Sequence, residues 1–273
     1  MVYQLKRRYP EDTRQIRPEQ TLDSGTPPIR SVPAGASVKW LQLGWRDLRR
    51  APAALLHGLV VSVAGVLLVW ATWSYPWLSM ALIVGFLLIG PSLAANLNAV
   101  AQSLERAEAA KPPDGSPGIA QIGGPLSRFT ALLFGLFILW TGYTWLWIAV
   151  MNVGHLGLPA HVGELLSAML ASPAGIVSLA GVLIIWLAFA FLAFAMSVIT
   201  VPAMLGHRLG VVDAVAVSLK AFRGNPVALT LWAALITALF VISVLTAFIA
   251  LIVIFPWLGF AMWHGYRDLV ATT

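Results

Sequence analysis

Few residues of this 273-residue chain could do chemistry, and two of them are histidines within apolar segments. His57 lies about one and a half helical turns into the first apolar run, and His264 lies near the end of the last. Histidine is a frequent axial ligand of haem iron, so this pair could hold haem. Each imidazole could instead bond a backbone carbonyl or extend toward the membrane interface. We expect no cofactor, with His57 and His264 as the haem ligands to test.

A second polar cluster lies in the loop 153–173, between the middle apolar runs. His161 and Glu164 are three residues apart, which would put them on one face of a short helix, and His155 could approach from the loop. Two imidazoles and a carboxylate can bind a transition-metal ion. Because no second acidic residue accompanies them, the alternative is a surface-lying helix whose apolar side chains face lipid or a partner. His155, His161 and Glu164 are therefore candidate metal ligands.

The sequence contains no signature of an enzyme. It lacks GxSxG, HExxH and a phosphate-binding loop, and it has no cysteine. None of its eleven Asp and Glu residues falls inside a predicted span, whereas ion-coupled carriers usually place a charge there. We therefore expect a protein that is not an enzyme, and an ion-driven transporter is disfavoured.

The composition indicates a membrane protein. Apolar residues make up 59% of the chain and charged residues 10%, against about 25% charged in soluble domains. The net charge of +6 is concentrated near the N-terminus, where residues 1–50 hold ten Lys and Arg against five Asp and Glu. A basic segment beside the first apolar run is typical of binding to anionic lipid headgroups. We therefore expect membrane lipids, and no nucleic acid, as partners.

The distribution of charge predicts where the chain crosses the membrane. A hydrocarbon core of about 30 Å requires about 20 helical residues. The charge-free run 51–104 is too long for one helix and should break at "TWSYPW" (72–77), and the run 224–266 should turn near 243–246. The predicted spans are 52–74, 77–99, 128–152, 174–200, 226–243 and 247–266.

All seventeen Lys and Arg residues then lie on one side of the membrane or at its border. The positive-inside rule makes that side cytoplasmic, and both termini with it. Residues 1–37 mix both charge signs with five prolines and are predicted to be a disordered cytoplasmic tail. The predicted fold is an all-α integral membrane domain over 38–270, with six transmembrane helices arranged as three hairpins.

Two amphipathic helices are predicted on the membrane surface, over 38–50 and 211–223, before the first and fifth spans. Each leads through a proline, Pro52 or Pro226, into a spanning helix. Their basic side chains are predicted to contact anionic headgroups: Arg46, Arg49, Arg50, Lys220 and Arg223.

Small residues predict where helices approach closely. Ala54, Gly58 and Ser62 recur every four residues on the first span, and Gly135 and Gly142 lie seven apart on the third. Because a six-helix bundle must first pack against itself, we assign such stripes to internal packing before oligomerisation.

Three strings resemble landmarks of a bacterial integral-membrane family: "GPSLAANLNAVAQSLERAE" (90–108), "SLKAFRGNP" (218–226) and "PWLGFAMWHGYRDLV" (256–270). The family is the domain of unknown function 2189, some of whose members carry the label putative cytochrome c oxidase subunit. The resemblance covers about residues 38–270 and implies a multi-pass protein of the bacterial inner membrane.

Two functions follow as hypotheses. The first is a non-enzymatic accessory, assembly or scaffolding subunit of a larger inner-membrane complex, with other membrane subunits as partners; a respiratory complex is implied only by the family label. The alternative is a permease or a protein that handles lipid or another small molecule, using a polar cavity near Asn96, Asn98, Thr141 and Tyr143.

Overall fold

The computed structural model describes residues 26–108, 119–151, 167 and 169–270. Within these ranges the chain forms α-helices and no β-strand, apart from one isolated bridge between Ile29 and Val270. The helices are α1 (Ala36–Arg50), α2 (Ala54–Ala71), α3 (Pro76–Leu93), α4 (Ala95–Glu108), α5 (Ile119–Met151), α7 (Pro173–Ser197), α8 (Thr200–His207), α9 (Val211–Gly224), α10 (Pro226–Leu245) and α11 (Leu251–Leu269).

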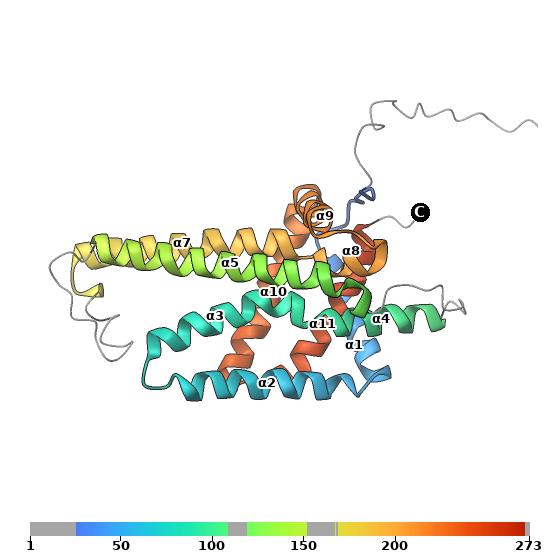
Figure 1. The fold of residues 1–273 in the computed structure, drawn as a ribbon, viewed down its shortest axis with the longest axis horizontal. Coiled ribbons are helices and arrows are strands. Elements are labelled where there is room, and N and C mark those ends of the chain that lie inside the picture. The colour runs from blue at the N-terminus through green and yellow to red at the C-terminus, as the bar shows by residue number, and fades with distance from the viewer. Residues whose placement is uncertain (1–25, 109–118, 152–166, 168, 271–273) are drawn as a thin grey trace, which may run out of the picture.

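Helices of two orientations make up the molecule. In Figure 1, α2, α3, α5 and α7 run along its long axis, whereas α10 and α11 run across it. Helices α1, α4 and α8 lie toward one end. We call it the charged end, because the described Lys and Arg residues fall in α1, α4, α9, the start of α5, the end of α11 and the segments beside them.

In the described part of the chain, five helical stretches are long and apolar enough to cross a membrane. They are Ala54–Ala71, Ala81–Glu108, Ile122–Met151, Pro173–His207 and Pro226–Leu245. The predicted break at 72–77 is confirmed, since α2 ends at Ala71 and α3 begins at Pro76. Six crossings are not confirmed, because α11 is not among the five stretches.

The last turn lies further along the chain than predicted. The sequence indicated 243–246, but α10 continues to Leu245 and α11 begins at Leu251. Ala247 and Phe248 adopt positive φ values of 48° and 66° between them. The sequence could not reveal this turn, because left-handed backbone is usually marked by glycine or asparagine.

Both predicted amphipathic helices are present. Helix α1 begins two residues before the predicted 38, and α9 covers the predicted 211–223 with one residue added. Pro226 is the first residue of α10, as expected. Pro52 differs, because it lies in a turn two residues ahead of α2 rather than at its first position.

Asn225 joins the N-terminal segment to the corner between α9 and α10. Its Oδ1 accepts a hydrogen bond from the Val32 amide at 2.8 Å, and its Nδ2 donates to the Arg30 carbonyl at 3.0 Å. The Arg30 amide in turn donates to the Leu269 carbonyl at 2.8 Å. Residues 26–35, predicted to be tail, are therefore held against the helical domain; residues 1–25 lie outside the described ranges.

The core forms around α11, which packs against α1, α2 and α4. Glycines permit the close approach: a Cβ at Gly58 would collide with the Ile252 carbonyl, and one at Gly44 would lie 2.6 Å from the Ala261 amide nitrogen. Gly58 and Ser62 thus serve internal packing, as predicted for their stripe. Gly135 and Gly142 have no described atom within 4 Å of a Cβ position, so the internal packing predicted for their stripe is not observed.

We expect Gly58→Ala to lower the thermal midpoint of the purified protein in mild detergent. Its methyl group would meet backbone atoms of α11, and such overpacking costs about 1–3 kcal/mol. Gly142→Ala is the matched control, because its methyl group enters open space. Its helix propensity should rise, so its midpoint should stay equal or increase. Equal losses in the two variants would contradict the assigned α2–α11 contact.

Candidate functional site

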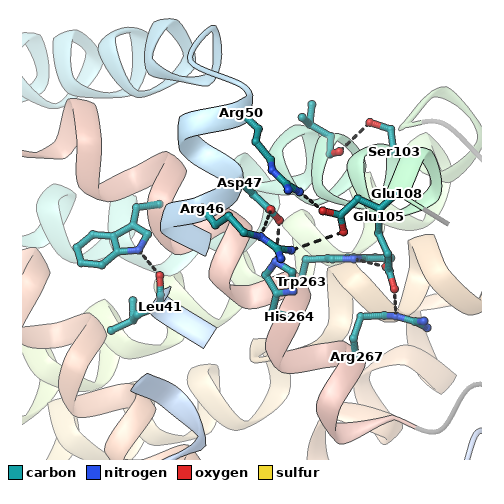
Figure 2. A network of polar contacts seen from close by, with 12 residues as sticks. Leu41, Arg46, Asp47, Arg50, Ser103, Glu105, Glu108, Trp263, His264 and Arg267 are labelled. Atoms are coloured by element: carbon teal, nitrogen blue, oxygen red, sulfur yellow. Dashed lines mark hydrogen bonds and ion pairs between the residues drawn. The ribbon is translucent and has the colours of Figure 1, made fainter. Parts of the chain in front are cut away.

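A network of charged and polar side chains joins α1, α4 and α11 at the charged end, as Figure 2 shows. We call it the polar network; its members are Arg46, Asp47, Arg50, Glu105, Glu108, Trp263, His264 and Arg267. On each helix the members lie within little more than one turn, and the three helices are far apart in sequence.

The most buried contact of the network joins α1 to α11. His264 Nε2 lies 2.7 Å from Asp47 Oδ2, and the Asp47 side chain is 4% exposed. Arg46 Nε lies 3.5 Å from the other carboxylate oxygen. Because a buried carboxylate is costly unless it is paired, Asp47 requires both neighbours.

The other contacts connect α4 to its two neighbours. Glu105 accepts hydrogen bonds from Trp263 Nε1 and Arg267 Nε of α11, both at 2.8 Å. Glu108 is ion-paired with Arg50 of α1, and this hydrogen bond raises the pKa of the Arg50 guanidinium. The ion pairs of α4 are more exposed than Asp47, so solvent screens them more strongly.

The polar network contains one histidine–carboxylate contact, between His264 and Asp47, and among the described residues no serine hydroxyl is bonded to that histidine. A Ser-His-Asp triad needs a nucleophile bonded to the histidine. The Ser103 hydroxyl drawn in Figure 2 instead donates to the Val100 carbonyl of its own helix at 2.7 Å. Within the described residues, no three His, Asp or Glu side chains are arranged to hold a metal ion. What the contacts do is fix α1 and α4 to α11.

The two candidate haem ligands have separate surroundings. His57 Nε2 lies 3.0 Å from the Leu93 carbonyl at the end of α3, and its ring stacks on Phe255. His264 contacts Asp47, more than two turns further along α11 than Phe255. Both Nε2 atoms thus have protein partners, and no contact brings the two rings together, so the geometry does not fit a haem held between them. The candidate metal ligands His155, His161 and Glu164 lie outside the described residues.

The residues predicted to contact lipid headgroups differ in their partners. Arg46 and Arg50 pair with carboxylates of the polar network, and the Arg49 guanidinium lies 5.9 Å from the Trp45 ring centroid. Lys220 donates to the Thr26 hydroxyl at 3.1 Å. Arg223 is exposed, and no partner for it occurs among the described residues. Headgroup contact stays a prediction for all five; among the described residues Arg49 has no carboxylate partner, and Arg223 has neither a carboxylate nor an aromatic partner.

An apolar cavity of about 390 Å³ lies among α3, α5, α7, α10 and α11, and the end of α9 closes one side. Each of these helices contributes apolar side chains, such as Leu87, Trp140, Leu187, Phe222, Ile236 and Leu258. No charged residue lines it in the described part of the chain. Hydropathy could not predict this cavity, because the same residue types fill cores, face lipid and line cavities.

The cavity does not contain the polar residues suggested for a permease. The Asn98 amide is buried and donates to the Ala94 carbonyl at 3.1 Å, and Thr141 donates to Phe137 of its own helix at 2.9 Å. Asn96 and Tyr143 are exposed. Because these four residues do not line the cavity, its wall is suited to a hydrocarbon group instead.

A family model described as "Predicted integral membrane protein (DUF2189)" matches residues 79–206, from α3 to the end of α8. The predicted resemblance is thereby confirmed; of its three strings, 90–108 falls inside the match, and 218–226 and 256–270 fall outside it. No curated protein and no solved structure matches the chain.

We expect Asp47→Ala to destabilise the protein strongly, because it leaves His264 and Arg46 without their carboxylate. Losing a hydrogen bond to a charged group costs about 1.5–3 kcal/mol. Thermal unfolding in mild detergent should show a clear fall of the midpoint. Glu108→Ala, which removes an exposed carboxylate of the same network, should change it little. A larger fall of the midpoint in Glu108→Ala than in Asp47→Ala would contradict the greater contribution to stability assigned to Asp47.

Proposed function

We propose that this integral membrane protein is not an enzyme and binds a membrane phospholipid, one of whose hydrocarbon tails occupies the apolar cavity. The observation that carries the proposal is an uncharged cavity of about 390 Å³ within the membrane helices. Sites for small ligands typically enclose about 300–1,000 Å³. A polar solute would find no charged group there, whereas an alkyl chain finds aromatic and aliphatic side chains.

The cavity also has a route for a lipid. Leu187 and Phe191 of α7 line it, yet they are 59% and 58% exposed on the outside of the molecule. A tail could therefore enter sideways from the bilayer without passing through water. Because an empty apolar cavity loses dispersion contacts, a neighbouring tail should fill it.

Selection of one lipid over another needs a polar contact, since a tail gains little by leaving other tails. Arg223 is the candidate. It directly follows Phe222, which lines the cavity, and its guanidinium is exposed and unpaired within the described chain. A basic residue near a membrane surface contributes about 1 kcal/mol of attraction to anionic lipid. We therefore expect a phospholipid with an anionic headgroup.

For orientation, we propose that the charged end faces the cytoplasm, following the positive-inside rule. Both termini would then be cytoplasmic, in a bacterial inner membrane. No observation specifically supports the accessory or scaffolding role. Co-purification of other subunits in the experiment below would favour it.

The test compares two double variants reconstituted in mixed-lipid nanodiscs and then analysed by native mass spectrometry. Ala190→Phe with Ala233→Phe places bulk into the cavity from α7 and α10. Ala188→Phe with Ala234→Phe adds the same bulk to exposed positions of the same helices. The added rings occupy the cavity, so a tail can no longer enter it. Retained phospholipid should therefore fall in the cavity variant and stay constant in the control.

The headgroup is tested with Arg223→Gln against Arg49→Gln, an exposed arginine of α1. The first should lower the preference for phosphatidylglycerol over phosphatidylethanolamine about fivefold. Arg49 is also a predicted headgroup contact, but α1 does not line the cavity, so the second should change the preference of the retained lipid less. Equal lipid retention in all variants would overturn the proposal. Protein subunits that co-purify in fixed ratio, with no retained lipid, would favour the accessory role instead.

A further inference from the structure

We infer that α10 and α11 form a re-entrant hairpin, which enters the membrane from the charged end, turns in the middle of the bilayer and leaves by the same face. The full crossings would then be α2, α3, α5 and α7. This inference concerns topology and does not depend on lipid binding.

Both ends of the hairpin lie at the charged end. Helix α10 starts after Asn225, whose side chain binds residues 30 and 32. At the end of α11, Asp268 accepts hydrogen bonds from Lys39 Nζ at 3.0 Å and from Trp40 Nε1 at 2.9 Å, both on α1. The hairpin therefore begins and ends beside the same surface helix and the same N-terminal segment.

The turn of the hairpin meets α2 at the middle of that helix. The Ser62 hydroxyl donates to the Phe248 carbonyl at 2.7 Å. The Phe248 ring lies against Gly65, where a Cβ would be 3.1 Å from it. Since α2 runs from Ala54 to Ala71, about six more residues, or about 9 Å, separate this contact from its far end.

Contacts with α3 place the turn at the same depth, independently of the contacts with α2. Ile83 and Phe86 pack against the cluster formed by Val61, Phe248 and Leu251. They lie at the centre of α3, which runs from Pro76 to Leu93. The turn thus lies level with the midpoint of two neighbouring helices that each cross the membrane. Helix α10 has enough length to span, with 20 residues, but it runs across the long axis in Figure 1.

The residues of the turn suit hydrocarbon and not water. Leu245 is 80% exposed and Ile249 is 68% exposed, so the tip presents large apolar side chains outward. Loops at a membrane surface usually carry Gly, Pro, Asn, Asp or Ser. Residues 245–250, "LTAFIA", include none of these.

The backbone amides of the turn are paired within the protein. The Phe248 amide donates to the Ser243 carbonyl at 2.7 Å, and the Ala250 amide donates to Thr246 Oγ1 at 3.1 Å. Thr246 Oγ1 donates to the Ile242 carbonyl at 2.9 Å. Irregular backbone at membrane depth is tolerated only where protein satisfies its polar groups. The Phe248 carbonyl accepts a hydrogen bond from the Leu251 amide at 3.0 Å within the hairpin, and the Ser62 hydroxyl of α2 is a second donor to it.

Because the chain has no cysteine, single cysteines can report the depth of the turn directly. Ile249→Cys carries a spin label at the tip, and Trp73→Cys and Val212→Cys carry it at exposed positions at the far end of α2 and on α9. Leu245→Cys is a second tip position should Ile249→Cys fold poorly. Collision with oxygen and with a nickel chelate in liposomes gives the depth of each label.

A re-entrant hairpin predicts a tip label near the bilayer centre, about 15 Å below either interface, with both reference labels shallow. Oxygen accessibility should therefore be highest, and nickel accessibility lowest, at Ile249 or Leu245. A tip label as shallow as that at Trp73 would mean that α10 and α11 each cross, and would overturn the inference. The lipid-retention result cannot affect this measurement, so the two proposals fail separately.

Discussion

The close approach of α11 to α1 and α2 is the contact on which the rest of the structure depends. It is made backbone to backbone, at Gly44 against Ala261 and at Gly58 against Ile252. In lipid there is little hydrophobic gain from bringing helices together, so van der Waals contact between such surfaces must supply the attraction. Side chains larger than hydrogen at these two positions would separate the helices and weaken every contact that α11 makes with its neighbours.

The polar network and the apolar cavity mark two parts of the molecule that differ in polarity. At the charged end, where α1 and the end of α4 lie, ion pairs and indole hydrogen bonds join the helices. Further from that end, aromatic and aliphatic side chains surround a space that no charged residue of the described chain lines. The polar network fixes the relative positions of its helices, but it requires a buried Asp47 carboxylate. The cavity leaves space that a neighbouring lipid can occupy.

The sequence predicted the elements better than their arrangement. Charge placement and the proline at 76 were enough to locate α2, α3, α7 and the amphipathic α9, because these signals are local. The depth of the last hairpin depends on where Phe248 meets Ser62, a contact between residues 186 apart in sequence. No local pattern encodes it.

For the candidate sites, too, the sequence predicted individual residues better than their contacts. His57 and His264 were recognisable as unusual polar residues in apolar surroundings, but their partners, the Leu93 carbonyl and Asp47, follow from packing. The cavity was not foreseeable at all, since its lining has the composition of any lipid-facing helix. The sequence identified Arg223 as a candidate headgroup contact. It could not show that Arg223 has no partner among the described residues.

The bridge between Ile29 and Val270 has a consequence for biosynthesis. The ribosome produces residue 29 long before residue 270, and the amide of Arg30 finds its acceptor, the Leu269 carbonyl, only when the final helix has been made. Until then α1 also lacks α11, the helix with which it makes its most extensive contact. Until α11 has been made, Gly44 of α1 and Gly58 of α2 therefore lack the helix that covers them, and the fold cannot close. A ribosome that stops before the last helix would leave a protein that is inserted but open, with its glycine faces available to other helices or to quality-control proteases.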